Sequence, residues 1–184
     1  MELRIFNINL AAESFLERIR HYISEGGEYE LKLLTVVSDG INDQQLHLNF
    51  DVIPVDIGGR HDFKPYGYRI YRSPRDRTPE FLDTHVTILE DDSGIRTVAT
   101  LMDKVVQTEA YGNLMDLVTS LASNPYVVPI SIASGLFQIA LKVLKGNSDD
   151  LWMQADSSFN KELNEFTGNF TIDNPRLSID MGFV

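Results

Sequence analysis

The chain of 184 residues contains no cysteine. This absence excludes a thiol nucleophile, a redox-active thiol and any thiolate metal site. A chain of this length can bury a sizeable core without disulfides, so we expect one domain, residues 1–184. The opening residues, MELRIFNINLAAESF, lack a basic segment followed by a continuous apolar stretch, so we expect no secretory signal and a cytoplasmic location.

Positive charge is also scarce. The sequence has 16 basic and 27 acidic residues, a formal net charge of −11. Such a charge argues against non-specific attraction of the whole molecule to nucleic acid or anionic lipid. The basic residues are unevenly spread, because residues 60–77 hold six of them against two acidic residues. This segment has a local charge of +4, which leaves the rest of the chain at −15.

Recognisable catalytic motifs are missing as well. The sequence shows neither a glycine-rich phosphate loop nor a G-x-S-x-G elbow. Its four histidines are far apart and match no metal or triad spacing. His47 and His85 each fall on the less apolar face of a predicted strand, and they can meet if those strands pair. A hydrolase or transferase that uses His47 or His85 with a nearby carboxylate is therefore an alternative to a binding protein.

Hydrophobic spacing predicts strands early and late in the chain and helices between them. A period of two predicts strands within residues 3–10, 29–40, 45–52, 81–90, 149–159 and 166–183. A helical period marks residues 15–23 and three stretches inside residues 93–146. The predicted fold class is therefore α+β and mainly β: a β-sandwich-like arrangement of antiparallel sheets, with a helical insertion at about residues 93–146 and a short N-terminal helix.

Residues 117–141 contain no charge. This stretch is long enough to cross a bilayer. Pro125 and Pro129 interrupt it, however, and its serine, asparagine and glutamine side chains would need partners in lipid. We therefore expect a buried helix packed against the sheet, with a helix that binds a partner or a membrane surface as the alternative. A membrane span is not expected.

Tyrosines and arginines alternate from Tyr66 to Arg77. Such a surface can stack bases and hold phosphates, but no nucleic-acid motif accompanies it, and the rest of the chain is acidic. A charged edge strand is one interpretation, because charge prevents unwanted strand pairing. A patch for an anionic partner is the other. The candidate partner-binding residues are Tyr66, Tyr68, Arg69, Tyr71 and Arg72.

Carboxylates gather at the two ends of the predicted helical insertion. Glu90, Asp91 and Asp92 stand at its start, and Asp149 and Asp150 stand at its end. If the insertion begins and ends at neighbouring strand ends, these oxygens converge in the way that calcium tolerates. The competing interpretation is local, with Asp92 or Ser93 as a helix N-cap and residues 148–150 as a solvated turn. Both stay open, and the candidate metal ligands are Asp91, Asp92, Asp149 and Asp150.

The motifs LEDDSG at residues 89–94 and GNSDDLW at residues 146–152, with the strand pattern from residue 29 to the end, resemble the C2-like domains. This family contains calcium-binding, lipid-binding and protein-binding β-sandwiches. The resemblance implies a sandwich fold and a binding role. The acidic residues depart from the spaced aspartates of calcium-binding members, and three helices between the two acidic motifs are more than that family usually inserts.

The first functional hypothesis is a non-enzymatic binding or interaction module with a protein partner, assisted by calcium as an optional cofactor. A third hypothesis, beside the interaction module and the hydrolase or transferase, is a structural or oligomeric assembly subunit. In that case edge strands and the uncharged helix form the contact between subunits. A nucleic-acid partner is not expected, whereas peripheral contact with a membrane stays open.

Overall fold

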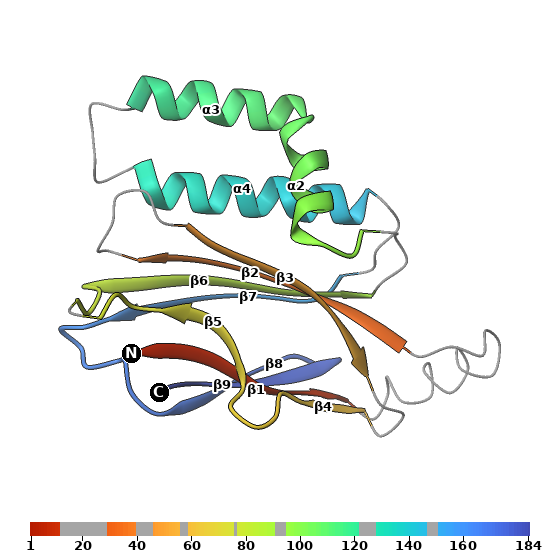
Figure 1. Ribbon diagram of the computed structural model, residues 1–184, viewed down its shortest axis with the longest axis vertical. Coiled ribbons are helices and arrows are strands. Elements are labelled where there is room, and N and C mark those ends of the chain that lie inside the picture. The colour runs from red at the N-terminus through yellow and green to blue at the C-terminus, as the bar shows by residue number, and fades with distance from the viewer. Residues whose placement is uncertain are drawn as a thin grey trace.

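The computed structural model describes residues 1–11, 29–39, 46–55, 59–75, 77–90, 95–121, 128–146 and 151–184. The helix predicted at residues 15–23 lies outside these ranges. The described elements form three layers, because two antiparallel sheets face each other and helices cover the outer face of one of them (Figure 1). The predicted class, α+β and mainly β with a sandwich-like arrangement, is confirmed.

The first sheet, sheet A, contains five strands. They are β1 (Glu2–Leu10), β4 (Arg60–Asp62), β5 (Tyr68–Arg72), β8 (Asn169–Asp173) and β9 (Leu177–Phe183). The order is β4-β1-β9-β8, and β5 pairs with the first half of β1 on the edge where β4 pairs with its second half. β4 and β5 therefore act as one interrupted edge strand, with the turn at residues 63–67 between them.

The second sheet, sheet B, has the order β3-β2-β6-β7. Its strands are β2 (Tyr29–Asp39), β3 (Leu46–Val55), β6 (Phe81–Glu90) and β7 (Leu151–Asn160). The sequence pattern predicts that Pro54 weakens the end of β3, yet Pro54 still stands opposite Glu30. A proline is tolerated there because β3 lies at the edge of the sheet, where one side of the strand needs no ladder donor.

The central strand β2 of sheet B is buried on both of its faces. Leu31, Leu33 and Val37 of β2 pack toward sheet A, whereas Leu34 and Val36 pack toward the helices. The period-two pattern indicates one core face for β2, and this prediction is incomplete because the helical layer covers the other face. The apolar face predicted for β3 belongs to the helical side. The core between the sheets also includes Leu3, Ile5, Ile8, Leu82, Val86, Ile88, Leu177, Ile179 and Met181.

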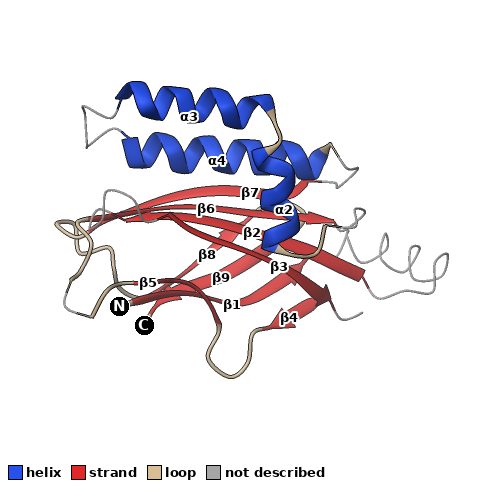
Figure 2. Cartoon of the chain, turned by 45° about the horizontal axis from the view of Figure 1, so that its top comes forward, coloured by secondary structure: helices blue, strands red, loops and turns tan. Residues whose placement is uncertain are grey.

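Three described helices connect β6 to β7. They are α2 (Val98–Val106), α3 (Glu109–Leu121) and α4 (Val128–Lys145), and all three lie on one side of sheet B (Figure 2). α4 contacts β2 and β6 directly. None of the helices within the described ranges is long and apolar enough to cross a membrane.

The predicted cap of the first inserted helix is wrong. The helix starts at Val98, and the side chain of Thr97, rather than that of Asp92 or Ser93, accepts the N–H of Thr100 at 3.1 Å. Residues 95–97, directly before the helix, are not helical, and Ile95 among them is buried in the core under the helices. The acidic motif therefore does not cap α2.

Candidate functional site

Four charged side chains meet on the outer face of sheet A. In β1, Leu3 and Ile5 point into the core, so Glu2 and Arg4 point away from it. β5 pairs with this half of β1, with Arg72 opposite Glu2 and Arg69 opposite Arg4. Directly opposed residues project from the same face of a sheet. The strand register therefore places one glutamate among three arginines.

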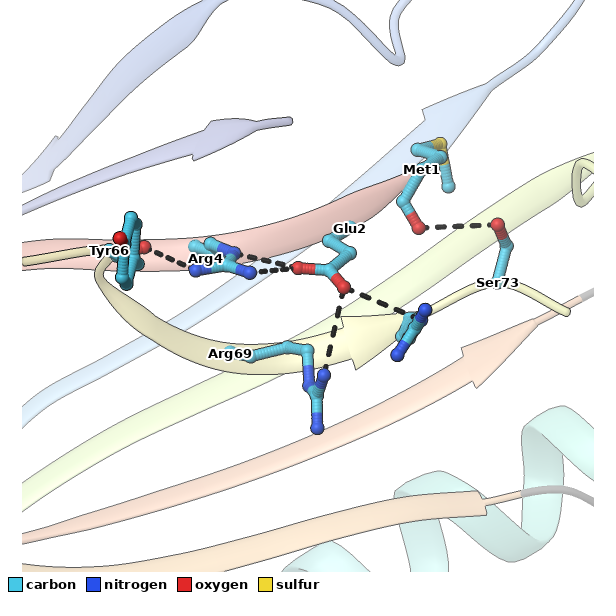
Figure 3. A network of polar contacts seen from close by, with 7 residues as sticks. Met1, Glu2, Arg4, Tyr66, Arg69 and Ser73 are labelled. Atoms are coloured by element: carbon cyan, nitrogen blue, oxygen red, sulfur yellow. Dashed lines mark hydrogen bonds and ion pairs between the residues drawn. The ribbon is translucent and has the colours of Figure 1, made fainter. Parts of the chain in front are cut away.

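The carboxylate of Glu2 is the centre of this cluster (Figure 3). Arg4 donates to Glu2 Oε2 from Nε at 2.8 Å and also from a terminal nitrogen, and its other terminal nitrogen donates to the carbonyl of Tyr66. The second oxygen, Oε1, lies 3.6 Å from a terminal nitrogen of Arg69 and 3.4 Å from Nε of Arg72. Arg4 is thus held closely, whereas Arg69 and Arg72 are paired loosely.

The charges of the cluster do not cancel. The hydrogen bond from Arg4 lowers the pKa of Glu2 below its ordinary value, and the charges of Arg4, Arg69 and Arg72 lower it further. Glu2 is therefore ionised near neutral pH, and three guanidiniums with one carboxylate leave a net charge of +2. The side chains of Arg69 and Arg72 are 51% and 56% exposed, against 19% for Arg4. The surplus positive charge is at the solvent side.

The turn between β4 and β5 presents an aromatic ring beside this charge. Tyr66 is 75% exposed, and its backbone carbonyl accepts the hydrogen bond from Arg4. Gly67 follows it with a φ of +79°, and a Cβ there would lie 2.9 Å from the carbonyl oxygen of Ile5. The turn therefore requires glycine both for its backbone conformation and for its close approach to β1.

The other two predicted partner-binding tyrosines point inward. Tyr68 packs against the core between the sheets, and burial, with the charge of Asp51, raises its pKa to about 12. Tyr71 is 1% exposed, and its hydroxyl donates to Asp39 Oδ2 at 2.7 Å. As a correction, Tyr71 is a core residue and is not available to a partner. Tyr71 is opposite Leu3 in the register, and Leu3 is also buried.

The backbone of β5 is partly covered by sheet B. Nδ2 of Asn49, on β3, donates to the carbonyl of Ile70 at 2.9 Å and to Oγ1 of Thr35 at 3.1 Å. A carbonyl of β5 that does not serve the ladder with β1 is therefore satisfied within the molecule.

Sequence reasoning identifies Arg69 and Arg72 but misses Glu2 and Arg4. The alternation of apolar residues in β1 does place both on the polar face. Nothing in the local pattern shows, however, that this strand pairs with a segment more than sixty residues away. The missing signal is the pairing itself.

The two histidines of the enzyme alternative do not come together. β2 lies between their strands, with His85 opposite Val36 and His47 opposite Val37. Neighbouring residues of a strand face opposite sides, so the histidines project from opposite faces of sheet B. Each does have a carboxylate nearby: Nδ1 of His85 lies 2.7 Å from Asp156 Oδ1.

The corresponding distance for His47 is longer, with Nε2 3.9 Å from Asp39 Oδ2. A cavity of about 500 Å³ between α3 and α4 is lined by neither histidine; its walls are Thr108, Glu109, Ala110, Asn113, Ile139, Lys142 and Val143. The two histidine–carboxylate pairs are thus separate from this cavity.

The candidate calcium ligands Asp91, Asp92, Asp149 and Asp150 lie outside the described residues. The strands that flank them are described, and Leu89 of β6 pairs with Leu151 of β7. The helical insertion therefore does leave and re-enter sheet B on neighbouring strands, as the calcium hypothesis requires. Among the described residues, no group of three or more histidine, aspartate or glutamate side chains is placed to hold a metal ion.

Comparisons with protein-family models, with curated proteins and with solved structures give no match to this chain. The resemblance to C2-like domains therefore stays a prediction.

Proposed function

We propose that this protein is a non-enzymatic interaction module that binds a protein partner through the arginine surface, which we define as Arg69, Arg72 and the exposed ring of Tyr66. The observation that carries the proposal is the net charge of +2 left around Glu2, with both outer guanidiniums about half exposed. The partner segment that fits this surface is acidic.

Two physical features support recognition at this place. Arginine and tyrosine, with tryptophan, are enriched among the side chains that dominate the energy of protein interfaces, because they combine a flat apolar surface with hydrogen-bond donors. The surface is also partly ordered before binding, since Glu2 forms ion pairs with both outer arginines and Arg4 donates to the carbonyl of Tyr66. Preorganised side chains lose less entropy when a partner binds.

The net charge of the whole chain, −11, opposes long-range attraction of an acidic partner. Recognition must therefore arise from short-range contacts at the arginine surface, which makes it selective for a partner whose shape brings an anionic group to that place. As a refinement of this proposal, the protein binds calcium through Asp91, Asp92, Asp149 and Asp150, in keeping with the C2-like resemblance.

The test is the binding of a labelled peptide rich in glutamate and aspartate, measured by fluorescence anisotropy, with a lysine-rich peptide of equal length as the reference. We expect the acidic peptide to bind, and the Arg69→Ala/Arg72→Ala variant to lose about tenfold in affinity or more. Arg60→Ala is the matched control, because Arg60 is 57% exposed on the neighbouring strand and pairs with Asp62.

Two results would contradict the proposal. One is that neither peptide binds the protein. The other is that the double variant and the Arg60→Ala control bind the acidic peptide equally well.

A further inference from the structure

Arg69 and Arg72 converge on one point. The nearest nitrogen of each lies within 3.6 Å of the same oxygen, Oε1 of Glu2, although the two side chains come from positions three residues apart. Glu2 satisfies only part of their hydrogen-bonding capacity, because each guanidinium carries five N–H donors in a planar fork. Two forks that meet at one place can donate to a single anion.

We propose that Arg69 and Arg72 form a seat for the phosphate of a phosphorylated side chain on the partner, an inference that rests on the interaction module proposed above. The charge count favours a phosphate monoester over a carboxylate. A phosphate monoester carries about −1.5 to −2 near neutral pH, which matches the +2 of the cluster, whereas a carboxylate leaves half of that charge unbalanced. Its three terminal oxygens also accept from both forks at once.

The surroundings favour a single phosphate over a polyanion. Asn7 of β1 stands opposite Asp62 on one side and Asp180 on the other. Both carboxylates share the outer face of sheet A with the arginine surface. That of Asp62 is paired with Arg60 and Lys64, whereas that of Asp180 accepts from the hydroxyl of Thr171. A membrane or a nucleic acid presents repeated negative charges, which would meet the carboxylate of Asp180 as well as the arginines. A phosphorylated protein segment places its dianion at the arginines alone.

The exposed ring of Tyr66 completes the seat. It stands in the turn just before β5, and its carbonyl is bonded to Arg4, which shares Glu2 with the two outer arginines. A residue next to the phosphorylated one can therefore pack against an aromatic face while the phosphate binds the guanidiniums. An aromatic phosphate monoester carries such a ring and the phosphate in one small probe.

The experiment uses phenyl phosphate and benzoate as probes, which share the ring and differ in the anion. NMR follows the Nε–H resonances of Arg69 and Arg72 in the wild type, and the backbone amide resonances of β1 and β5 in the wild type and all variants, during titration of the whole chain near neutral pH. We expect phenyl phosphate to shift the resonances of Arg69 and Arg72 in a saturable manner, with an affinity about tenfold higher than that of benzoate. The affinity should fall as the pH drops below the second phosphate pKa of about 6.

Three variants complete the design. Arg69→Ala/Arg72→Ala should abolish the binding of phenyl phosphate, and Arg60→Ala should leave it unchanged. Arg69→Lys/Arg72→Lys keeps both charges but removes the forks, so it should lose most of the preference for phosphate over benzoate. Circular dichroism verifies that each variant is folded, and the lysine variant provides the test if the alanine variant does not fold.

The outcomes separate this inference from the proposed function. Equal affinity for phenyl phosphate and benzoate, together with binding of the unphosphorylated acidic peptide, overturns the phosphate seat and leaves the interaction module standing. Backbone amide shifts in β1 and β5 that are the same in the wild type and the alanine variant overturn the seat. If the wild type also fails to bind the acidic peptide, the module is overturned too. A third outcome also overturns the inference: the wild type sediments with vesicles of phosphatidylcholine and phosphatidylserine, and the Arg69→Ala/Arg72→Ala variant does not. The partner of the arginine surface would then be a membrane and not a phosphorylated protein.

Discussion

The hydroxyl of Tyr71 donates a hydrogen bond to Asp39 across the interior of the sandwich, at 2.7 Å. Tyr71 is on β5 of sheet A and Asp39 is at the end of β2 of sheet B, and both are almost completely buried. Burial and the bond to Asp39 raise the pKa of Tyr71 well above its ordinary value. The bond therefore links the edge of one sheet to the other and holds β5 in the position from which Arg69 and Arg72 face solvent.

Tyr71→Phe should lower the free energy of unfolding by about 1–3 kcal/mol, because the buried Asp39 loses a donor. The measurement is equilibrium unfolding in urea. Tyr66→Phe removes the same hydroxyl from an exposed ring and serves as the control, with an expected change close to zero. If the two variants were equally stable, the bond from Tyr71 would not contribute to folding.

Glu2→Gln should lower stability at neutral pH by about 1 kcal/mol or less, because the arginines around Glu2 are partly exposed to solvent. The folded state lowers the pKa of Glu2, so this stabilisation is present above the pKa of the unfolded chain and disappears as the pH falls through the folded pKa. Urea unfolding from neutral to acid pH measures the difference between wild type and variant.

The matched control for this pH series is Glu162→Gln, since Glu162 is exposed in the connection after β7. The expected difference between wild type and Glu2→Gln shrinks toward low pH, and Glu162→Gln shows what the loss of one exposed carboxylate does by itself. A difference for Glu2→Gln that grows on acidification would show that the arginines do not stabilise its ionised form.

Phe137→Ala should destabilise the protein by about 3–5 kcal/mol, the usual cost of removing a buried aromatic side chain. Phe137 of α4 is fully buried, and its ring stacks on that of His85 of β6 with centroids 5.0 Å apart. Hydrogen exchange should show the largest loss of protection in α2, α3 and α4. Met115→Ala on the exposed side of α3 is the control, and equal loss of protection in sheet A would contradict an anchoring role for Phe137.

Calcium titration in a calorimeter tests the acidic motifs. We expect heat of binding and a higher melting temperature for the wild type, because the insertion leaves and re-enters on paired strands, with Leu89 opposite Leu151. Asp91→Asn/Asp149→Asn should remove both effects, whereas Asp116→Asn, an exposed position on α3, should retain them. Absence of heat and of any rise in melting temperature in the wild type would remove the metal hypothesis.

Much of the secondary structure follows from local periodicity. The strands of sheet B and the three helices between β6 and β7 are predicted because apolar residues recur at intervals that fit one buried face of a strand or helix. The prediction fails for the cap of α2, where Thr97 takes the role expected of Asp92 or Ser93. Threonine is also a preferred N-cap residue, so residue type alone does not fix where the helix starts.

The candidate site is predicted in part. Alternating tyrosine and arginine side chains mark residues 66–72, but alternation does not show which face of the strand is outside. Arg69 and Arg72 share the outer face, and Ile70 and Tyr71 are both buried, because the pairing of β5 with β1 is irregular between Leu3 and Arg4. In a strand with strict alternation, residues three apart project from opposite faces.

The amino-acid sequence by itself determined the strand and helix segments, the acidic balance and the concentration of positive charge between residues 60 and 77. Only the tertiary structure decided that Glu2 and Arg4 join Arg69 and Arg72, that Tyr71 bonds Asp39, and that His47 and His85 face opposite sides of sheet B. The physical reason is that periodicity is a property of neighbouring residues, whereas a site of this kind arises from strand order and register between distant segments.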